Sequence, residues 1–255
     1  MGQLLLKALV SVLPIVLILW YFYTRDANRE PRDVLTRTFW LGVLATLPVL
    51  GVSALLAFAE PQSMTLVLAA GYHAFLLAAV PEETAKLLII RGFCARDIHF
   101  DEPMDGIVYG VYAALGFAAV ENVVFALAFG WIVAGIRAFT ALPMHAAEGA
   151  IIGYAVARAR LGLARRGAVA KGLAVAMVLH GLYDFALLSI SGLAQLSGTG
   201  THGAIVGLSL LVVCLLIGAI LWTLRTVRRL RARQLNGEGH TPAYHSAGDS
   251  PSDRS

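Results

Sequence analysis

The chain has 255 residues, of which 58% are hydrophobic and only 14% are charged, and its mean hydropathy is +0.73. A soluble domain carries about 25% charged residues, so a soluble class is excluded and an all-α, polytopic membrane protein is predicted. The net charge of +4 does not indicate nucleic-acid binding, because Lys and Arg lie in short segments between apolar stretches. The two cysteines, Cys94 and Cys214, show neither metal-type spacing nor a disulfide framework.

Seven apolar stretches are long enough, or nearly long enough, to cross a bilayer as helices. In chain order they are residues 4–23, 34–58, 64–91, 105–129, 137–158, 171–190 and 203–224. The first is expected to be a retained helix, since it is too long for the core of a signal peptide and lacks a small-residue cleavage site. We expect residues 1–233 to form a single membrane domain and residues 234–255, rich in Gly, Ser, Pro and His, to be a disordered tail.

Basic residues alternate between the two ends of the predicted spans. Segments 24–37, 91–104 and 158–171 are rich in Arg and Lys, as is the start of the tail, whereas 59–63 and 191–202 contain neither residue. Cytoplasmic loops of membrane proteins carry the excess of positive charge. The pattern therefore predicts an outside N-terminus and a cytoplasmic C-terminus.

Four of the seven stretches carry ionisable side chains inside apolar sequence. A charged side chain at the centre of a bilayer costs about 3 kcal/mol or more, so such residues face the interior of a bundle and generally serve chemistry or transport. They are Glu82, Glu83 and Lys86; Glu121; His145 and Glu148; and His180 and Asp184.

The third stretch contains the segment Pro81-Glu82-Glu83-Thr84-Ala85-Lys86. Pro81 is expected to break or kink the helix. Glu82 and Lys86 are four residues apart, the spacing of a helical ion pair, and two adjacent acids against one cation leave a surplus carboxylate. We expect Glu82 to act as a base with Glu83 in support. To bring Glu82 to the depth of the other ionisable residues, the span is expected to start near Leu68 or to be displaced at Pro81.

The other three stretches each offer a functional and a structural interpretation. Glu121 lies deep in its span, where a protonated, hydrogen-bonded carboxyl would also be stable. His145 and Glu148 are three residues apart on one helical face, although a histidine within a membrane more often bonds a neighbouring helix. His180 and Asp184 are four residues apart, so the carboxylate can orient the imidazole and raise its basicity.

Together these side chains suit the activation of a water molecule within the membrane. Zinc would accept His145, His180 and a carboxylate such as Glu121, with a fourth position open for water. Alternatively, Glu82 is the base and the histidines donate to the oxyanion. In either case the two histidines are expected to converge with Glu82 and Glu121 in one cavity.

The ordered motifs resemble those of a known family. Glu-Glu-x-x-Lys, Phe-x-x-x-Glu-Asn, an isolated His and His-x-x-x-Asp follow one another as they do in the PrsW intramembrane proteases. Further similarity comes from Tyr23-x-x-Asp26, Glu30-Pro31 and the segment from Glu102 to Gly110. The resemblance covers residues from about 20 to 190.

The resemblance implies an active centre and a substrate class. Its motif positions in this chain are Glu82, Glu83, Glu121, His145, His180 and Asp184. The family cleaves anti-sigma factors, so a membrane-anchored protein substrate in the plasma membrane of a bacterium is expected. PrsW-like proteins are described as metalloproteases, whereas the related CAAX-prenyl proteases resemble glutamate-dependent enzymes, so the resemblance leaves zinc and glutamate mechanisms both open.

Three classes of function therefore compete. An intramembrane endopeptidase is favoured, because peptide hydrolysis needs a base and donors for the oxyanion in a water-accessible cavity. A proton- or cation-coupled transporter would also bury carboxylates and histidines, but the sequence shows no inverted repeat. A non-catalytic scaffold would leave the buried ionisable residues unexplained.

Overall fold

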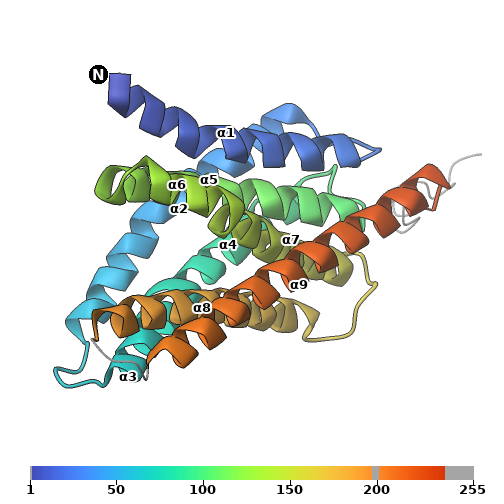
Figure 1. Cartoon of the computed structure of the whole chain (residues 1–255). Helices are drawn as coiled ribbons and strands as arrows, with labels where there is room; N and C mark the ends of the chain where they lie inside the picture. The colour runs from blue at the N-terminus through green and yellow to red at the C-terminus, as the bar shows by residue number, and fades with distance from the viewer. Residues whose placement is uncertain (1, 197–200, 239–255) are drawn as a thin grey trace, which may run out of the picture.

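A computed structural model of the chain describes residues 2–196 and 201–238, with side chains from residue 10 onward. All regular structure in these residues is helical, which confirms the predicted all-α class. The elements are α1 (Gly2–Arg25), α2 (Arg32–Phe58), α3 (Leu66–Gly71), the π-helix η1 (Tyr72–Ala79), α4 (Val80–Gly92), the 3-10 helix η2 (Cys94–Arg96), α5 (Pro103–Phe129), α6 (Trp131–Phe139), α7 (Ala141–Arg160), α8 (Ala168–Gln195) and α9 (Thr201–Leu235) (Figure 1).

Four of the described helices, α2, α5, α8 and α9, are long and apolar enough to cross a membrane. The described apolar part of α1, Val10–Arg25, is shorter. The count of seven spans and the orientation of the termini stay predictions. One predicted boundary is wrong: the stretch 137–158 starts inside a separate short helix, α6, and α7 begins only at Ala141. The sequence stays apolar across the turn at Thr140, and Pro143 in the first turn of α7 was the available signal of a new helix.

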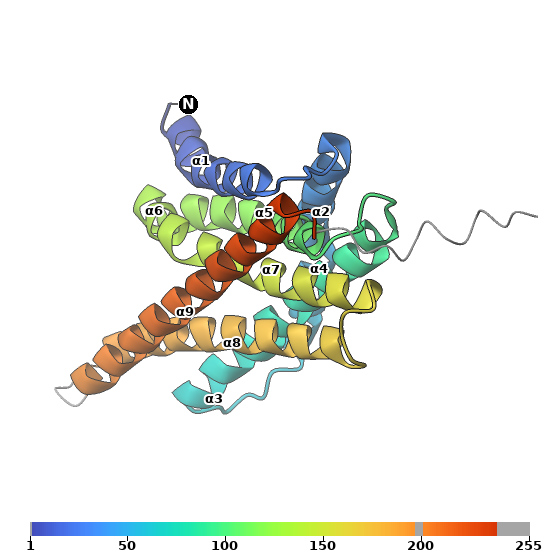
Figure 2. The same ribbon diagram turned by 90° about the vertical axis from the view of Figure 1, so that its right-hand side faces the viewer.

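Helix α5 occupies the core of the bundle and is buried along most of its length. It lies between α1 and α7, and α9 crosses α7 and α8 diagonally (Figure 2). Two glycine pairs allow close contact between α5 and α7: a Cβ on Gly153 would lie 1.7 Å from the carbonyl oxygen of Gly106, and one on Gly110 would lie 2.0 Å from that of Gly149. Small residues permit such approach of membrane helices, and the approach places Glu121 beside His145.

The third predicted span is a continuous helix from Leu66 to Gly92, made of α3, η1 and α4. A break or a kink was expected at Pro81, and the helix is not broken there. Instead, the eight residues before Val80 form a π-helix. Pro81 has no N–H to donate to the Leu77 carbonyl four residues earlier, and the Ser53 hydroxyl of α2 donates to that carbonyl at 2.6 Å. A widened turn of this kind is common at functional sites, and here it leads directly into Glu82.

Helix α9 extends to Leu235, two residues past the predicted end of the membrane domain. Gln234 is buried, and its amide nitrogen donates to Asp26 Oδ1 at 2.7 Å and to Glu102 Oε2 at 2.9 Å. The end of α9 therefore packs onto the loop between α1 and α2. Residues 239–255, most of the predicted tail, lie outside the described residues.

Candidate active site

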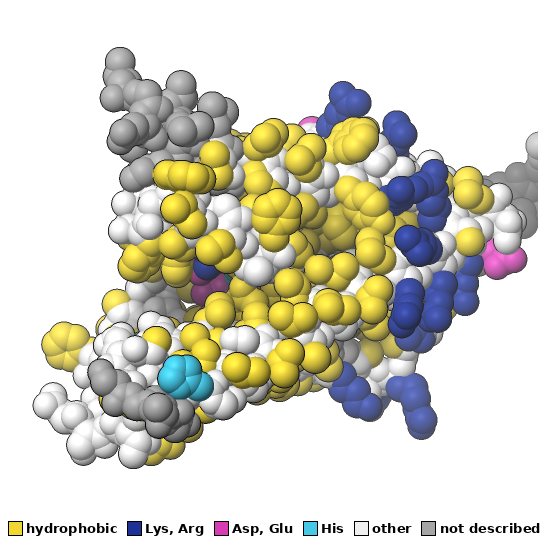
Figure 3. Space-filling model, in the orientation of Figure 1, with side chains coloured by type: hydrophobic (Ala, Val, Ile, Leu, Met, Phe, Trp, Pro, Cys, Tyr) yellow, Lys and Arg dark blue, Asp and Glu magenta, His cyan; other side chains and the backbone are white. Residues whose placement is uncertain are grey.

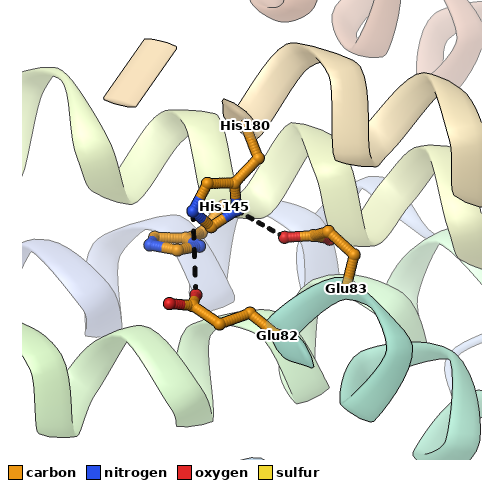
Figure 4. Close-up of side chains that lie close together, drawn as sticks. All are labelled: Glu82, Glu83, His145 and His180. Carbon is orange, nitrogen blue, oxygen red and sulfur yellow. Dashed lines mark hydrogen bonds and ion pairs between the residues drawn. The ribbon is translucent and has the colours of Figure 1, made fainter. Parts of the chain in front are cut away.

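Helices α4, α5, α7 and α8 bring their ionisable side chains together in the interior. We call this set the central cluster; its members are Glu82, Glu83, Lys86, Glu121, His145, Glu148, His180 and Asp184. Figure 4 shows Glu82 and Glu83 of α4 pointing toward His180 of α8, with His145 of α7 beside them. The two imidazole rings are 5.3 Å apart between centroids, which confirms the predicted convergence of the histidines.

Lys86 supplies positive charge to the central cluster. Its Nζ lies 2.5 Å from Glu83 Oε1 and 3.4 Å from Glu148 Oε2, and the side chain is 1% exposed. The predicted pair between Glu82 and Lys86 is therefore wrong. Spacings of three and four residues both permit a helical ion pair, and the ammonium lies on the side where Glu148 and His145 provide further acceptors.

Glu82 is the surplus acid. It is buried, no hydrogen bond to it is found among the described residues, and its Oε2 lies 3.8 Å from His180 Nε2. Glu83, by contrast, accepts from Lys86 and from His180 through the same oxygen. The two neighbouring acids thus differ: Glu83 is held by two donors, whereas the contact that the structure gives for Glu82 is the longer one with His180.

The contacts of His145 indicate which of its two ring nitrogens carries the proton. Lys86 Nζ lies 2.9 Å from Nδ1, and because an ammonium only donates, Nδ1 accepts. Nε2–H then donates to Glu121 Oε2 at 3.0 Å. Glu121 also receives the guanidinium of Arg137 at 2.7 Å.

His180 contacts carboxylates through both ring nitrogens. Nδ1 lies 2.6 Å from Glu83 Oε1, and Nε2 lies 3.3 Å from Asp184 Oδ2, one helical turn further along α8. The predicted proximity of His180 and Asp184 is confirmed. Acids on both sides of the ring fix its orientation.

Two residues were not singled out as site residues from the sequence. Glu148 is 1% exposed, and its Oε2 lies 3.5 Å from Nδ1 of both His145 and His180; the three-residue spacing from His145 was the available signal. Arg137 of α6 bonds Glu121 and Asn122 Oδ1. Its only signal was its isolation as the one basic residue of segment 130–137.

A small polar cavity opens beside the two histidines and Glu121, and Glu82, which was expected in the same cavity, is not among the residues that line it. Its volume is about 10 Å³, close to the minimum that one water molecule needs. It is lined by Glu121, Arg137, Ala141, Met144, His145, Glu148, His180, Tyr183 and Asp184. Figure 3 shows acidic and basic side chains within a hollow of an otherwise apolar face, while Lys and Arg gather at one end of the molecule.

The central cluster suits a metal ion of the zinc type. Glu82, Glu83, His145 and His180 each offer one ligand atom, and these atoms all lie within 4.8 Å of one another. Imidazole and carboxylate are zinc ligands. One buried oxygen each of Glu82, Glu83 and Glu148 accepts no hydrogen bond from the part of the chain that the structure describes, as expected where an ion or water supplies the partner. Glu121, the carboxylate that the sequence suggested as a ligand, is outside this group of four.

Comparison with known proteins identifies the family. A model described as the PrsW family intramembrane metalloprotease matches residues 30–220. The chain is 33% identical to Protease PrsW of Bacillus subtilis, over 71% of this chain and 82% of that protein. It is 35% identical to Protease PrsW of Geobacillus kaustophilus, over 70% of this chain and 78% of that protein. No solved structure matches it. The chain therefore belongs to the PrsW family of intramembrane metalloproteases and is a membrane-embedded peptidase.

Proposed function

We propose that the chain hydrolyses a membrane-anchored protein of the anti-sigma-factor kind at the central cluster, with Glu82 as general base. The observation that carries this proposal is the contrast within α4. Glu83 is paired with Lys86 at 2.5 Å, whereas Glu82 makes no hydrogen bond among the described residues and its Oε2 is 3.8 Å from His180 Nε2. This distance is longer than a direct hydrogen bond, so Glu82 keeps an oxygen that can accept from a water molecule.

We assign the remaining residues of the central cluster to balancing the charge of Glu83, orienting His180 and donating hydrogen bonds to the oxyanion. Lys86 and His180 keep Glu83 ionised, and Asp184 orients His180. Arg137 and the Nε2–H of His145 both point at Glu121 and are the donors nearest to a developing oxyanion. Peptide hydrolysis then requires proton transfer from water to Glu82 and from Glu82 to the leaving amine.

A zinc ion would be held by His145, His180 and a carboxylate of the central cluster. When bound, it would lower the pKa of its water and polarise the scissile carbonyl. Glu82 and Glu83 lie within the group of possible ligands, so one of them would complete the ligand set in place of Glu121. If Glu82 is that ligand, Glu83 or Glu148 would take over proton transfer.

In the proposed topology the chain is a seven-span protein of the bacterial plasma membrane, with its N-terminus outside. The end of the bundle at which Lys and Arg gather (Figure 3) would face the cytoplasm. This end carries the loop between α1 and α2, the loop between α7 and α8, and the C-terminal part of α9.

The test uses detergent-purified full-length protein and a peptide with one membrane anchor. We expect cleavage of the anchored peptide, one equivalent of zinc per active chain, and loss of cleavage on chelation with recovery when zinc is returned. Full activity after exhaustive chelation, with no stoichiometric metal, would refute the zinc assignment and leave Glu82 as the base. Absence of cleavage in protein that binds zinc and unfolds cooperatively would refute the substrate class.

A further inference from the structure

A second set of buried acids lies at the basic end of the bundle. Asp26 and Glu30 belong to the loop between α1 and α2, and Asp105 to the first turn of α5; they are 3%, 5% and 1% exposed. Each offers an oxygen, and these oxygens all lie within 4.8 Å of one another. We call these three residues the loop cluster. Asp105 and Glu121 are sixteen residues apart on α5, which at 1.5 Å per residue is about 24 Å, so the loop cluster is separate from the central cluster.

Neutral donors position the loop cluster. Asp105 Oδ2 accepts from the backbone N–H groups of Asp101 at 2.8 Å and Glu102 at 2.6 Å. The Tyr109 hydroxyl donates to Glu30. These bonds fix the carboxylates in place but contribute no positive charge.

The negative charge of the loop cluster is not balanced by the protein. Within the described residues, no Lys or Arg forms a salt bridge with Asp26, Glu30 or Asp105.

One oxygen of the loop cluster, Oδ2 of Asp26, has no hydrogen-bond partner among residues 2–196 and 201–238. Asp26 Oδ1 accepts from the Gln234 amide at 2.7 Å and from the backbone N–H of Asn28 at 3.1 Å. Asp26 Oδ2 is buried and accepts no hydrogen bond. A buried oxygen of this kind normally has a partner, and beside two other carboxylates that partner is expected to be positively charged.

We propose that Asp26, Glu30 and Asp105 bind a hard divalent cation, Mg²⁺ or Ca²⁺, at a site distinct from the active centre. All three ligands are carboxylates, and oxygen-only sites select these ions, whereas zinc and other transition metals prefer sites with imidazole or thiolate. The cation would fasten the α1–α2 loop to the start of α5. Through Gln234, which bonds Asp26, it would also hold the end of α9.

Terbium luminescence and thermal unfolding test this site in the detergent-purified full chain. Tb³⁺ replaces Ca²⁺ at oxygen sites and is excited through a nearby tyrosine; Tyr109 contacts Glu30. We expect a saturable Tb³⁺ signal that Ca²⁺ or Mg²⁺ displaces, and a Tm that rises with the concentration of the competing ion. The ion that displaces Tb³⁺ at the lower concentration is the preferred one.

Four variants locate the ion. Glu30→Gln and Asp105→Asn keep an amide oxygen for the hydrogen bonds that the carboxylates accept, and each should weaken Tb³⁺ binding at least tenfold. Asp33→Asn, at an exposed acid of α2, should leave binding unchanged. Glu82→Gln should also keep the signal, because Glu82 belongs to the central cluster.

Several results would overturn the proposal. One is wild-type protein with no saturable signal and no rise of Tm with either ion. Another is a signal that survives in Glu30→Gln and Asp105→Asn but disappears in Glu82→Gln, since that ion lies in the central cluster. A third is a Tm that rises on acidification but does not change when Ca²⁺ or Mg²⁺ is added, which would show that protons rather than a metal ion neutralise the loop cluster. If both amide variants fail to fold, Asp26→Asn and the wild-type titrations decide.

Discussion

The central cluster and the loop cluster are both groups of buried acids, but their charges are balanced differently. In the central cluster, Lys86 lies within 3.4 Å of both Glu83 and Glu148, and imidazoles contact the other acids. In the loop cluster the observed donors are backbone amides, a phenol and a carboxamide. With Lys86 bound to Glu83 and Glu148, Glu82 is the acid that we propose as the base, whereas the neutral donors of the loop cluster leave the site that we propose for a cation from solution. On these proposals, the counter-charge rather than the acids themselves separates a reactive site from a structural one.

The sharpest test of this contrast is Glu82→Gln. We expect cleavage of an anchored peptide to fall at least about 100-fold, because the amide cannot accept a proton, and Tm to stay near the wild-type value, because Glu82 makes no hydrogen bond among the described residues. Glu60→Gln, at an acid that pairs with His73 away from the central cluster, is the matched control. Wild-type cleavage by Glu82→Gln would show that another group is the base.

Removing Lys86 should leave the central cluster without its internal cation, as the loop cluster is. Lys86→Met leaves Glu83 and Glu148 without their ammonium, and we expect a loss of about 3–5 kcal/mol in the free energy of unfolding, measured by denaturation in detergent. Lys171→Met, at an exposed lysine of α8, should change stability by less than about 0.5 kcal/mol. Equal stabilities for the two variants would mean that Lys86 does not balance these acids.

Gln234→Ala probes the neutral donors of the loop cluster. The substitution removes the amide that donates to Asp26 and Glu102, and we expect about 3 kcal/mol of destabilisation, since each of the two hydrogen bonds to a charged group contributes about 1.5 kcal/mol or more. Cleavage per folded molecule should be unchanged. The control is Gln195→Ala at the exposed end of α8. Loss of cleavage without loss of stability would connect the loop cluster to catalysis and end the distinction between the two clusters.

The smallest expected effect concerns the helix that carries Glu82. Ser53→Ala removes the hydroxyl that donates to the Leu77 carbonyl at 2.6 Å, and we expect a destabilisation of about 1 kcal/mol from thermal unfolding. Ser209→Ala removes a hydroxyl that bonds only within α9 on an exposed surface and should have no measurable effect. If the two variants are equally stable, the π-helix satisfies Leu77 without help from α2.

Sequence reasoning identified the all-helical class, the family and the residues that converge in the interior. It could do so because the cost of burying charge in a membrane makes each ionisable residue in an apolar stretch informative. It missed the short helix α6, and with it the contact between Arg137 and Glu121, because the stretch stays apolar across the turn at Thr140 and Pro143 was not taken as the start of a new helix. It also did not identify the loop cluster, because Asp26, Glu30 and Asp105 were noted only as positions within the segments that resemble the family.

The sequence by itself determined which side chains must avoid lipid, because that depends on residue type and on the polarity of neighbouring residues. Only the tertiary structure decided which partner each one takes. Helical spacing allowed Lys86 to pair with either Glu82 or Glu83, and the position of α7, set by its glycine contacts with α5, turned the ammonium toward Glu83 and Glu148. Helix packing therefore decides which of the two adjacent acids pairs with Lys86 and which is left for the proposed role of base, since a buried cation binds where the most acceptors meet.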